Sequence, residues 1–143
     1  MGLLTLPWKK QAKFVQNVAL FCVNEQFSDE LFAFIDAKAP GFAGEAHDAE
    51  YKLTDSAVHA EFTQTFESRI EAFIAGQGYT AADFYRLLKK ADDAGEETVT
   101  GFVKTLLTVF EFDVFVSLCR DEGKRGYLKQ IMSGWRATLT KKK

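Results

Sequence analysis

Side chains that could carry out catalysis or bind a metal are few and scattered along this sequence. Of the two histidines, His47 falls in a predicted irregular segment and His59 in the first turn of a predicted helix. The two cysteines, Cys22 and Cys119, lie among apolar residues, a setting typical of buried thiols. The sequence contains no P-loop, nucleophile elbow, Rossmann glycine pattern or zinc-ligand spacing. It therefore predicts a protein that is not an enzyme and that uses no cofactor and no metal.

Two groups of acidic residues are the remaining candidates for chemistry. Glu67 and Glu71 lie four residues apart on one face of a predicted helix, where paired acids usually form solvated surface. Residues 92–97 are rich in Asp and Glu but lack the alternating ligands of a calcium-binding loop. Both groups are therefore interpreted as surface acids.

Charge is distributed unevenly along the chain. The net charge is −2, but residues 1–13 carry +3, residues 14–123 carry −12 and residues 124–143 carry +7. The acidic central part argues against nucleic-acid binding, which requires a basic face on the fold. It favours either a cationic partner or basic ends that fold back onto the body. No stretch of 18 residues lacks charge, so no transmembrane segment is predicted.

The composition favours a single α-helical domain. The chain has 143 residues, of which 47% are hydrophobic and 14 are Phe, so it can bury a substantial core. Ala and Leu together number 30, against 13 for Val and Ile, which favours helix over sheet. The only prolines are Pro7 and Pro40, and long helices tolerate the proline-free remainder. The predicted fold class is all-α, a single-domain bundle of about six helices.

Apolar residues recur at spacings of three and four, as expected for helices that bury one face. Ser28 is the predicted start of the second helix, and Thr80 the predicted N-cap of the fourth. Gly76 and Gly78 are predicted to end the third helix. The predicted helices cover residues 8–23, 28 to before Pro40, 54 or 56 to 76, 80–91, 99–110 and 112–123, with an irregular segment at 39–53 and a further helical stretch after Gly126 left open.

Several short motifs, in a consistent order across about residues 12–122, follow a pattern shared with a known family of helical domains. They are Phe34-Ile35-Asp36, Phe42, Glu50-Tyr51-Lys52-Leu53, His59-Ala60-Glu61-Phe62, Thr80-Ala81-Ala82-Asp83-Phe84, Leu106-Leu107, Glu111-Phe112 and Phe115. Together these segments resemble the BART domain. The resemblance divides the chain into an N-terminal extension at 1–11, a BART-like domain at 12–122 and a basic C-terminal helix or tail at 123–143.

The resemblance implies a non-enzymatic effector or adaptor that binds a GTP-loaded Arf-like small GTPase. In BART domains an apolar groove receives the amphipathic N-terminal helix of the GTPase, a mode that needs exposed apolar residues at helical spacing. The resemblance also implies a role in ciliary or flagellar trafficking. Because the sequence shows no secretory signal, we expect a cytoplasmic location, with Cys22 and Cys119 reduced. From the motif positions we expect a groove lined by Phe62, Phe66, Leu106, Leu107, Phe112 and Phe115, with an acidic rim formed by Glu61, Glu111 and Asp113.

Other interpretations stay open at this point. Any phenylalanine of the expected groove could instead belong to the core. Residues 123–143 form a basic amphipathic segment that could bind calmodulin or a membrane surface, or could pack on the bundle through Trp135. The N-terminal Leu3-Leu4 segment could occupy the groove in cis. A structural axonemal adaptor without GTPase binding is a further alternative.

Overall fold

The protein is described by a computed structural model covering residues 2–46, 49–93 and 98–141. In these residues the secondary structure is helical, and the predicted all-α fold class is confirmed. The α-helices are α1 (Trp8–Val23), α2 (Glu25–Lys38), α3 (Leu53–Phe62), α4 (Ser68–Gly76), α5 (Ala81–Asp93), α6 (Thr98–Leu107), α7 (Phe112–Arg120) and α8 (Glu122–Lys141). The shorter elements are η1 (Leu3–Thr5), η2 (Ala39–Phe42), η3 (Thr63–Glu67) and η4 (Thr108–Phe110).

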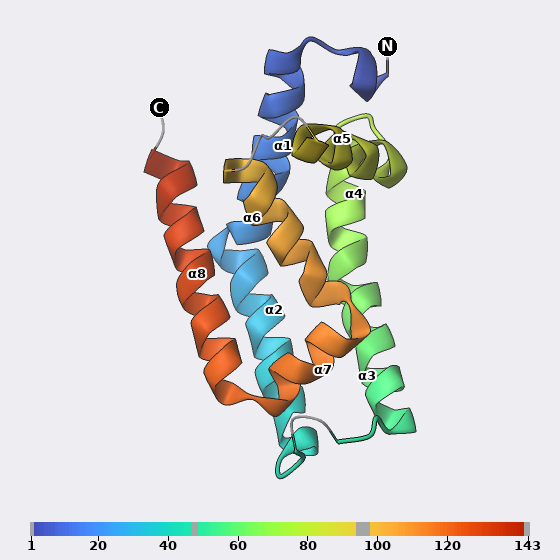
Figure 1. Cartoon of the computed structure of the whole chain (residues 1–143), viewed down its shortest axis with the longest axis vertical. Helices are drawn as coiled ribbons and strands as arrows, with labels where there is room; N and C mark the ends of the chain where they lie inside the picture. Colours follow the sequence, from blue (N-terminus) through green and yellow to red (C-terminus); the bar gives the residue numbers. More distant parts are fainter. Residues whose placement is uncertain (1, 47–48, 94–97, 142–143) are drawn as a thin grey trace.

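The helices form one bundle, in which α1 and α7 each pack against several other helices (Figure 1). In one half of the bundle α1 packs against α4, α6 and α8. In the other half the short helix α7 packs against α2, α3 and α8. The buried apolar side chains of these helices belong to one continuous cluster. A single hydrophobic core therefore holds both ends of the chain to the body.

Helix α2 begins three residues before the predicted start at Ser28, so that prediction is wrong. Asn24 caps the helix, because its side-chain oxygen accepts a hydrogen bond of 2.8 Å from the backbone N–H of Phe27. Ser28 is instead buried, and its hydroxyl accepts a hydrogen bond of 2.7 Å from Arg136 of α8. A capping residue four positions upstream was available in the sequence, and it determines where the helix starts.

The predicted third helix is continuous from Leu53 to Gly76 but contains a π-helical turn, η3, between α3 and α4. The apolar stripe explains this turn. In an α-helix, apolar residues spaced by four drift around the axis by about 40° at each step. The wider π turn returns Phe62, Phe66 and Ile70 to the same buried side. The run ends as predicted at Gly78, which has a left-handed φ of 93°. If α3, η3 and α4 are counted as one helix, the described residues contain seven long helices.

Two further predictions concern α5 and α8. The Thr80 hydroxyl accepts a hydrogen bond of 3.0 Å from the N–H of Asp83, which confirms the predicted N-cap of α5. Helix α8 starts at Glu122, before Gly126, and its apolar residues pack on the bundle. Met132 and Leu139 are buried, and Trp135 stacks on Phe102 with ring centroids 4.8 Å apart. The apolar face of α8 is therefore covered by the bundle. No helix among the described residues is long and apolar enough to cross a bilayer.

Candidate functional site

Four of the six residues expected to line the groove lie in the core. Phe62, Phe66, Leu106 and Phe115 are at most 3% exposed. The Phe62 ring stacks on Phe115 at 4.4 Å between centroids and tilts against Phe66 at 5.5 Å. These stripes face the interior of the bundle, because α3, α6 and α7 all turn their most apolar sides inward. In this structure these four residues are core residues and do not line an exposed groove.

The other two expected residues, Leu107 and Phe112, are partly exposed and flank the junction between α6 and α7. Element η4 makes this junction, and Glu111, in extended conformation, precedes α7. Phe112 packs edge-on against Tyr51 at 4.7 Å and against His59 at 5.3 Å. The structure thus brings part of the expected site to the surface at one place.

A concavity of about 470 Å³ lies beside this junction on the α5 side, and we call it the α5–α6 groove. Its apolar part comes from Tyr85 and Leu88 of α5 and from Leu107 of α6. Tyr85 is 40% exposed although it is a large aromatic residue. Tyr85 was not among the residues expected from the sequence, because nothing distinguishes its position on the helix from that of an ordinary surface residue. The lining residues are Tyr85, Leu88, Lys89, Lys104, Leu107, Thr108 and Glu111.

Two carboxylates, those of Glu67 and Glu71, act on Tyr85 in this groove, which Lys89 and Lys104 also line. Burial raises the pKa of the Tyr85 phenol, and the nearby carboxylates of Glu67 and Glu71 raise it further. The pKa of Glu67 is also raised, first by burial and then by the Glu71 charge. Glu67 lies in the π turn η3, and π turns often occur at functional sites. These two acids, interpreted from sequence as surface residues, therefore contribute to the field of the groove.

The three residues of the expected acidic rim are exposed but do not form one rim. Glu111 lines the α5–α6 groove. Asp113 lines a second concavity on the other side of the junction. Glu61 forms an ion pair of 3.4 Å with Lys38 of α2. Only Glu111 is therefore placed beside Leu107.

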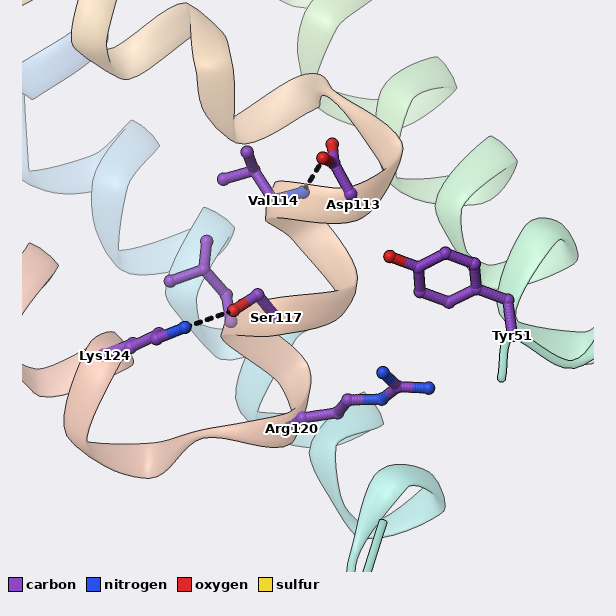
Figure 2. A pocket seen from close by; sticks show the side chains of 7 residues that line it. Tyr51, Asp113, Val114, Ser117, Arg120 and Lys124 are labelled. Carbon is purple, nitrogen blue, oxygen red and sulfur yellow. Dashed lines mark hydrogen bonds between the residues drawn. The ribbon is translucent and has the colours of Figure 1, made fainter. Parts of the chain in front are cut away.

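The second concavity, which we call the Tyr51 pocket, lies between the segment before α3 and helix α7 (Figure 2). Tyr51 is 52% exposed, and Leu53, two residues later, is 93% exposed. The Lys124 ammonium donates a hydrogen bond of 2.7 Å to the Ser117 hydroxyl in this pocket. The Glu50–Leu53 motif belongs to the segments that resemble the BART domain, but its residues were not among those expected to line the groove. The lining residues are Tyr51, Asp113, Val114, Ser117, Leu118, Arg120 and Lys124.

An ionic network around the buried Arg120 side chain fixes the segment that carries Tyr51. Glu45 accepts hydrogen bonds from Lys52 at 2.5 Å and from the Arg120 Nε at 2.9 Å. Arg120 also donates to the Glu50 carbonyl at 3.2 Å, and its guanidinium lies 5.2 Å from the Tyr51 ring centroid. The hydrogen bond from Lys52, followed by that from Arg120, lowers the pKa of Glu45. The segment before α3 is thereby held against α7.

His59, Cys22 and Cys119, which were first considered for catalysis or metal binding, have structural roles. His59 donates a hydrogen bond of 2.7 Å from Nε2 to the carbonyl of Phe110, which ties α3 to η4. Cys22 and Cys119 are buried as predicted, and burial raises the pKa of each thiol to about 12. His47 lies outside the described residues. In the described parts of the chain, no group of three or more His, Cys, Asp or Glu side chains could hold a metal ion.

Comparison with known proteins decides the family. Residues 10–125 match the family described as the ARF-like 2 binding protein BART. The chain belongs to the BART family. BART domains are binding domains rather than enzymes, and they match this chain over most of its length.

One curated relative also aligns with nearly the whole chain. Penicillin-binding protein 1A of Neisseria flavescens is 32% identical over 151 aligned positions, which cover 96% of this chain. The chain spans only 18% of the length of that protein. No solved structure matches the chain.

The BART match leaves segments at both ends of the chain outside it, and both pack on the domain. Leu3 is 1% exposed, and η1 contacts α5. The Gln11 amide holds this segment by donating hydrogen bonds of 3.0 Å to the carbonyls of Leu4 and Leu6. Among the described residues, none of this N-terminal segment lines the α5–α6 groove. At the other end, Arg136 of α8 donates a hydrogen bond of 2.6 Å to the Val23 carbonyl.

Proposed function

We propose that this BART domain binds an ARF-like small GTPase in its GTP-bound form, and that the α5–α6 groove receives the amphipathic N-terminal helix of the GTPase. The observation that carries the proposal is the match of residues 10–125 to the ARF-like 2 binding family. The ciliary or flagellar role implied by the family resemblance belongs to the same proposal.

The chemistry of the groove supports an amphipathic helix as its ligand. Leu107 and the face of Tyr85 offer partly exposed apolar contact on two neighbouring helices, and the buried Leu88 lies at the bottom of the groove. A tyrosine gives a large contact area with few rotatable bonds to restrict. Glu111 lines the groove, and Glu67 lies close enough to Tyr85 to affect its pKa. These acids would attract basic residues of the incoming helix on their side of the groove, whereas Lys89 and Lys104, which also line it, would attract acidic ones.

The buried phenylalanines have an indirect part in this proposal. Phe62 contacts Phe110 at 5.3 Å, next to the carbonyl that accepts the hydrogen bond of His59. This packing fixes η4, which sets the relative positions of Leu107 and Phe112. The four expected residues found in the core thus support the surface without contacting the partner.

The test is a binding titration with an ARF-like GTPase loaded with a non-hydrolysable GTP analogue. Leu107→Ala removes the apolar centre of the groove and is expected to weaken binding about tenfold or more, as for a central interface residue. Tyr127→Ala is the matched control, because Tyr127 is 66% exposed on α8, outside the BART match. Equal affinities of Leu107→Ala and Tyr127→Ala would remove the α5–α6 groove from the proposal.

A further inference from the structure

The start of α1 is unusually exposed. Figure 1 shows the first turns of α1 at one end of the bundle, where the N-terminal segment leaves it. From Pro7 to Lys13 every residue is exposed except Gln11, whose amide holds the N-terminal segment. Trp8 keeps 42% of its surface exposed, which is high for the largest apolar side chain.

Three lysines share one side of this exposed turn. With 3.6 residues per turn, Lys9, Lys10 and Lys13 fall within an arc of about 100° around the helix axis. In the described residues none of these three lysines forms an ion pair. The cations of α8 differ, because Lys129 and Arg125 both pair with Asp36, at 3.0 and 3.3 Å.

The local electrostatics of α1 do not favour these lysines. A helix N-terminus carries a partial positive charge, which favours acidic residues in the first turn. The first turn of α1 contains no acidic residue, and Pro7 provides no side-chain cap. Helix α8 ends at the same end of the bundle (Figure 1). Residues 1–13 thus carry a charge of +3 without an acidic residue, in a molecule whose net charge is −2.

We propose that this end of the molecule binds membrane surfaces that contain acidic phospholipids, through Lys9, Lys10 and Lys13 with Trp8 at the headgroup level. Clustered lysines attract an anionic lipid surface. An exposed indole is suited to the interface because it has an apolar body and one polar N–H. An acidic protein partner could also pair with the lysines, but it would not explain the exposed indole of Trp8 as an anionic membrane surface does.

The first experiment follows Trp8 by fluorescence in the full chain. The protein has two tryptophans, so Trp135→Phe leaves Trp8 as the only one and keeps an aromatic ring near Phe102. Vesicles of phosphatidylcholine with about 30 mol% phosphatidylserine are expected to shift the Trp8 emission to shorter wavelength, whereas pure phosphatidylcholine vesicles are not. No shift with the anionic vesicles, or equal shifts with both, would overturn the proposal.

The second experiment measures vesicle co-sedimentation of charge variants. Lys9→Gln, Lys10→Gln and Lys13→Gln together are expected to lower partitioning about a hundredfold. The control combines Lys38→Gln, Lys104→Gln and Lys124→Gln, which removes the same charge from α2, α6 and α8. It is expected to retain partitioning within a few-fold of the wild type. Equal loss in both triple variants, or binding to polyglutamate without binding to vesicles, would contradict a membrane-binding end.

Discussion

Phe62 and Phe112 both belong to segments that resemble the BART domain, but one side chain is buried and the other is partly exposed. Phe62 is fully buried between Phe115, Phe110 and Phe34, whereas Phe112 is partly exposed beside Tyr51. The sequence places both on apolar stripes, and periodicity alone does not distinguish a core phenylalanine from one at a surface junction. The turn at η4, which exposes Phe112, depends on contacts between distant segments.

This difference predicts unequal effects of substitution on stability. Phe62→Ala is expected to lower the free energy of unfolding by about 3–5 kcal/mol, because it leaves a cavity in a packed core. Phe112→Ala is expected to cost about 1 kcal/mol, since one side of its ring already contacts solvent. Urea denaturation of both variants measures the two changes. Similar losses of stability would show that Phe112 is as much a core residue as Phe62.

Two carboxyl groups are expected to affect the pH dependence of stability with opposite signs. Glu45 has a pKa below its usual 4.5 in the folded protein, so its contribution is present above pH 4.5 and is lost as the pH falls through the folded pKa. Glu67 has a raised pKa, so its contribution is present below pH 4.5 and is lost as the pH rises through the folded value.

Substituting each of these glutamates by glutamine tests the two opposite pH dependences of stability. Glu45→Gln is expected to destabilise the protein at pH 7 and to converge on the wild type in acid. Glu67→Gln is expected to stabilise the protein at pH 7, because the amide carries no charge to desolvate or repel Glu71. Melting temperatures between pH 3 and pH 7 measure both. Curves for Glu45→Gln that run parallel to the wild type would show that its ion pairs contribute nothing.

At the scale of the elements, Asn24 determines where α2 begins. Asn24→Ala removes the cap on Phe27 and is expected to cost about 1 kcal/mol. Asn17→Ala is the control, because Asn17 lies inside α1 and caps no helix; its effect is expected to stay within about 0.5 kcal/mol. Chemical denaturation separates the two, and equal effects would show that the cap does not stabilise α2.

Helix α1 permits a related substitution that separates stability from function. Lys9→Glu places an acidic residue in the first turn, where it is expected to stabilise the helix by about 0.5 kcal/mol. The same change should weaken binding to anionic vesicles. A stabilised variant that binds vesicles as well as the wild type would separate Lys9 from the membrane-binding face.

Much of the element order was predictable because each helix carries a local signal. The 3.6-residue periodicity predicts α1 with its observed bounds, and Thr80 predicts the cap of α5. The surface of the site was less predictable. Tyr85 and Tyr51 become part of concave surfaces only when distant segments pack together. The spacing of four between Phe62, Phe66 and Ile70 is visible in the sequence, but the π turn η3 forms only when this stripe packs in the core.

At the scale of the whole molecule, the matched BART segment and the flanking ends form one structure. Helix α8 packs on α1, its Met132 and Leu139 side chains are buried, and Arg136 donates a hydrogen bond to the Val23 carbonyl at the end of α1. The basic C-terminal helix is therefore a part of the fold whose apolar face is occupied. The proposed GTPase surface and the proposed membrane surface lie on different elements, so each can be altered while the other is measured.

The most direct measurement is the affinity of the intact chain for one ARF-like GTPase, determined by titration calorimetry in two nucleotide states. We predict that the form loaded with a non-hydrolysable GTP analogue binds at least about tenfold more tightly than the GDP form. Leu107→Ala should lower that affinity, and Tyr127→Ala should leave it unchanged. Equal affinity for the two nucleotide states, or no binding to either, would contradict the proposal that this domain is a GTPase effector.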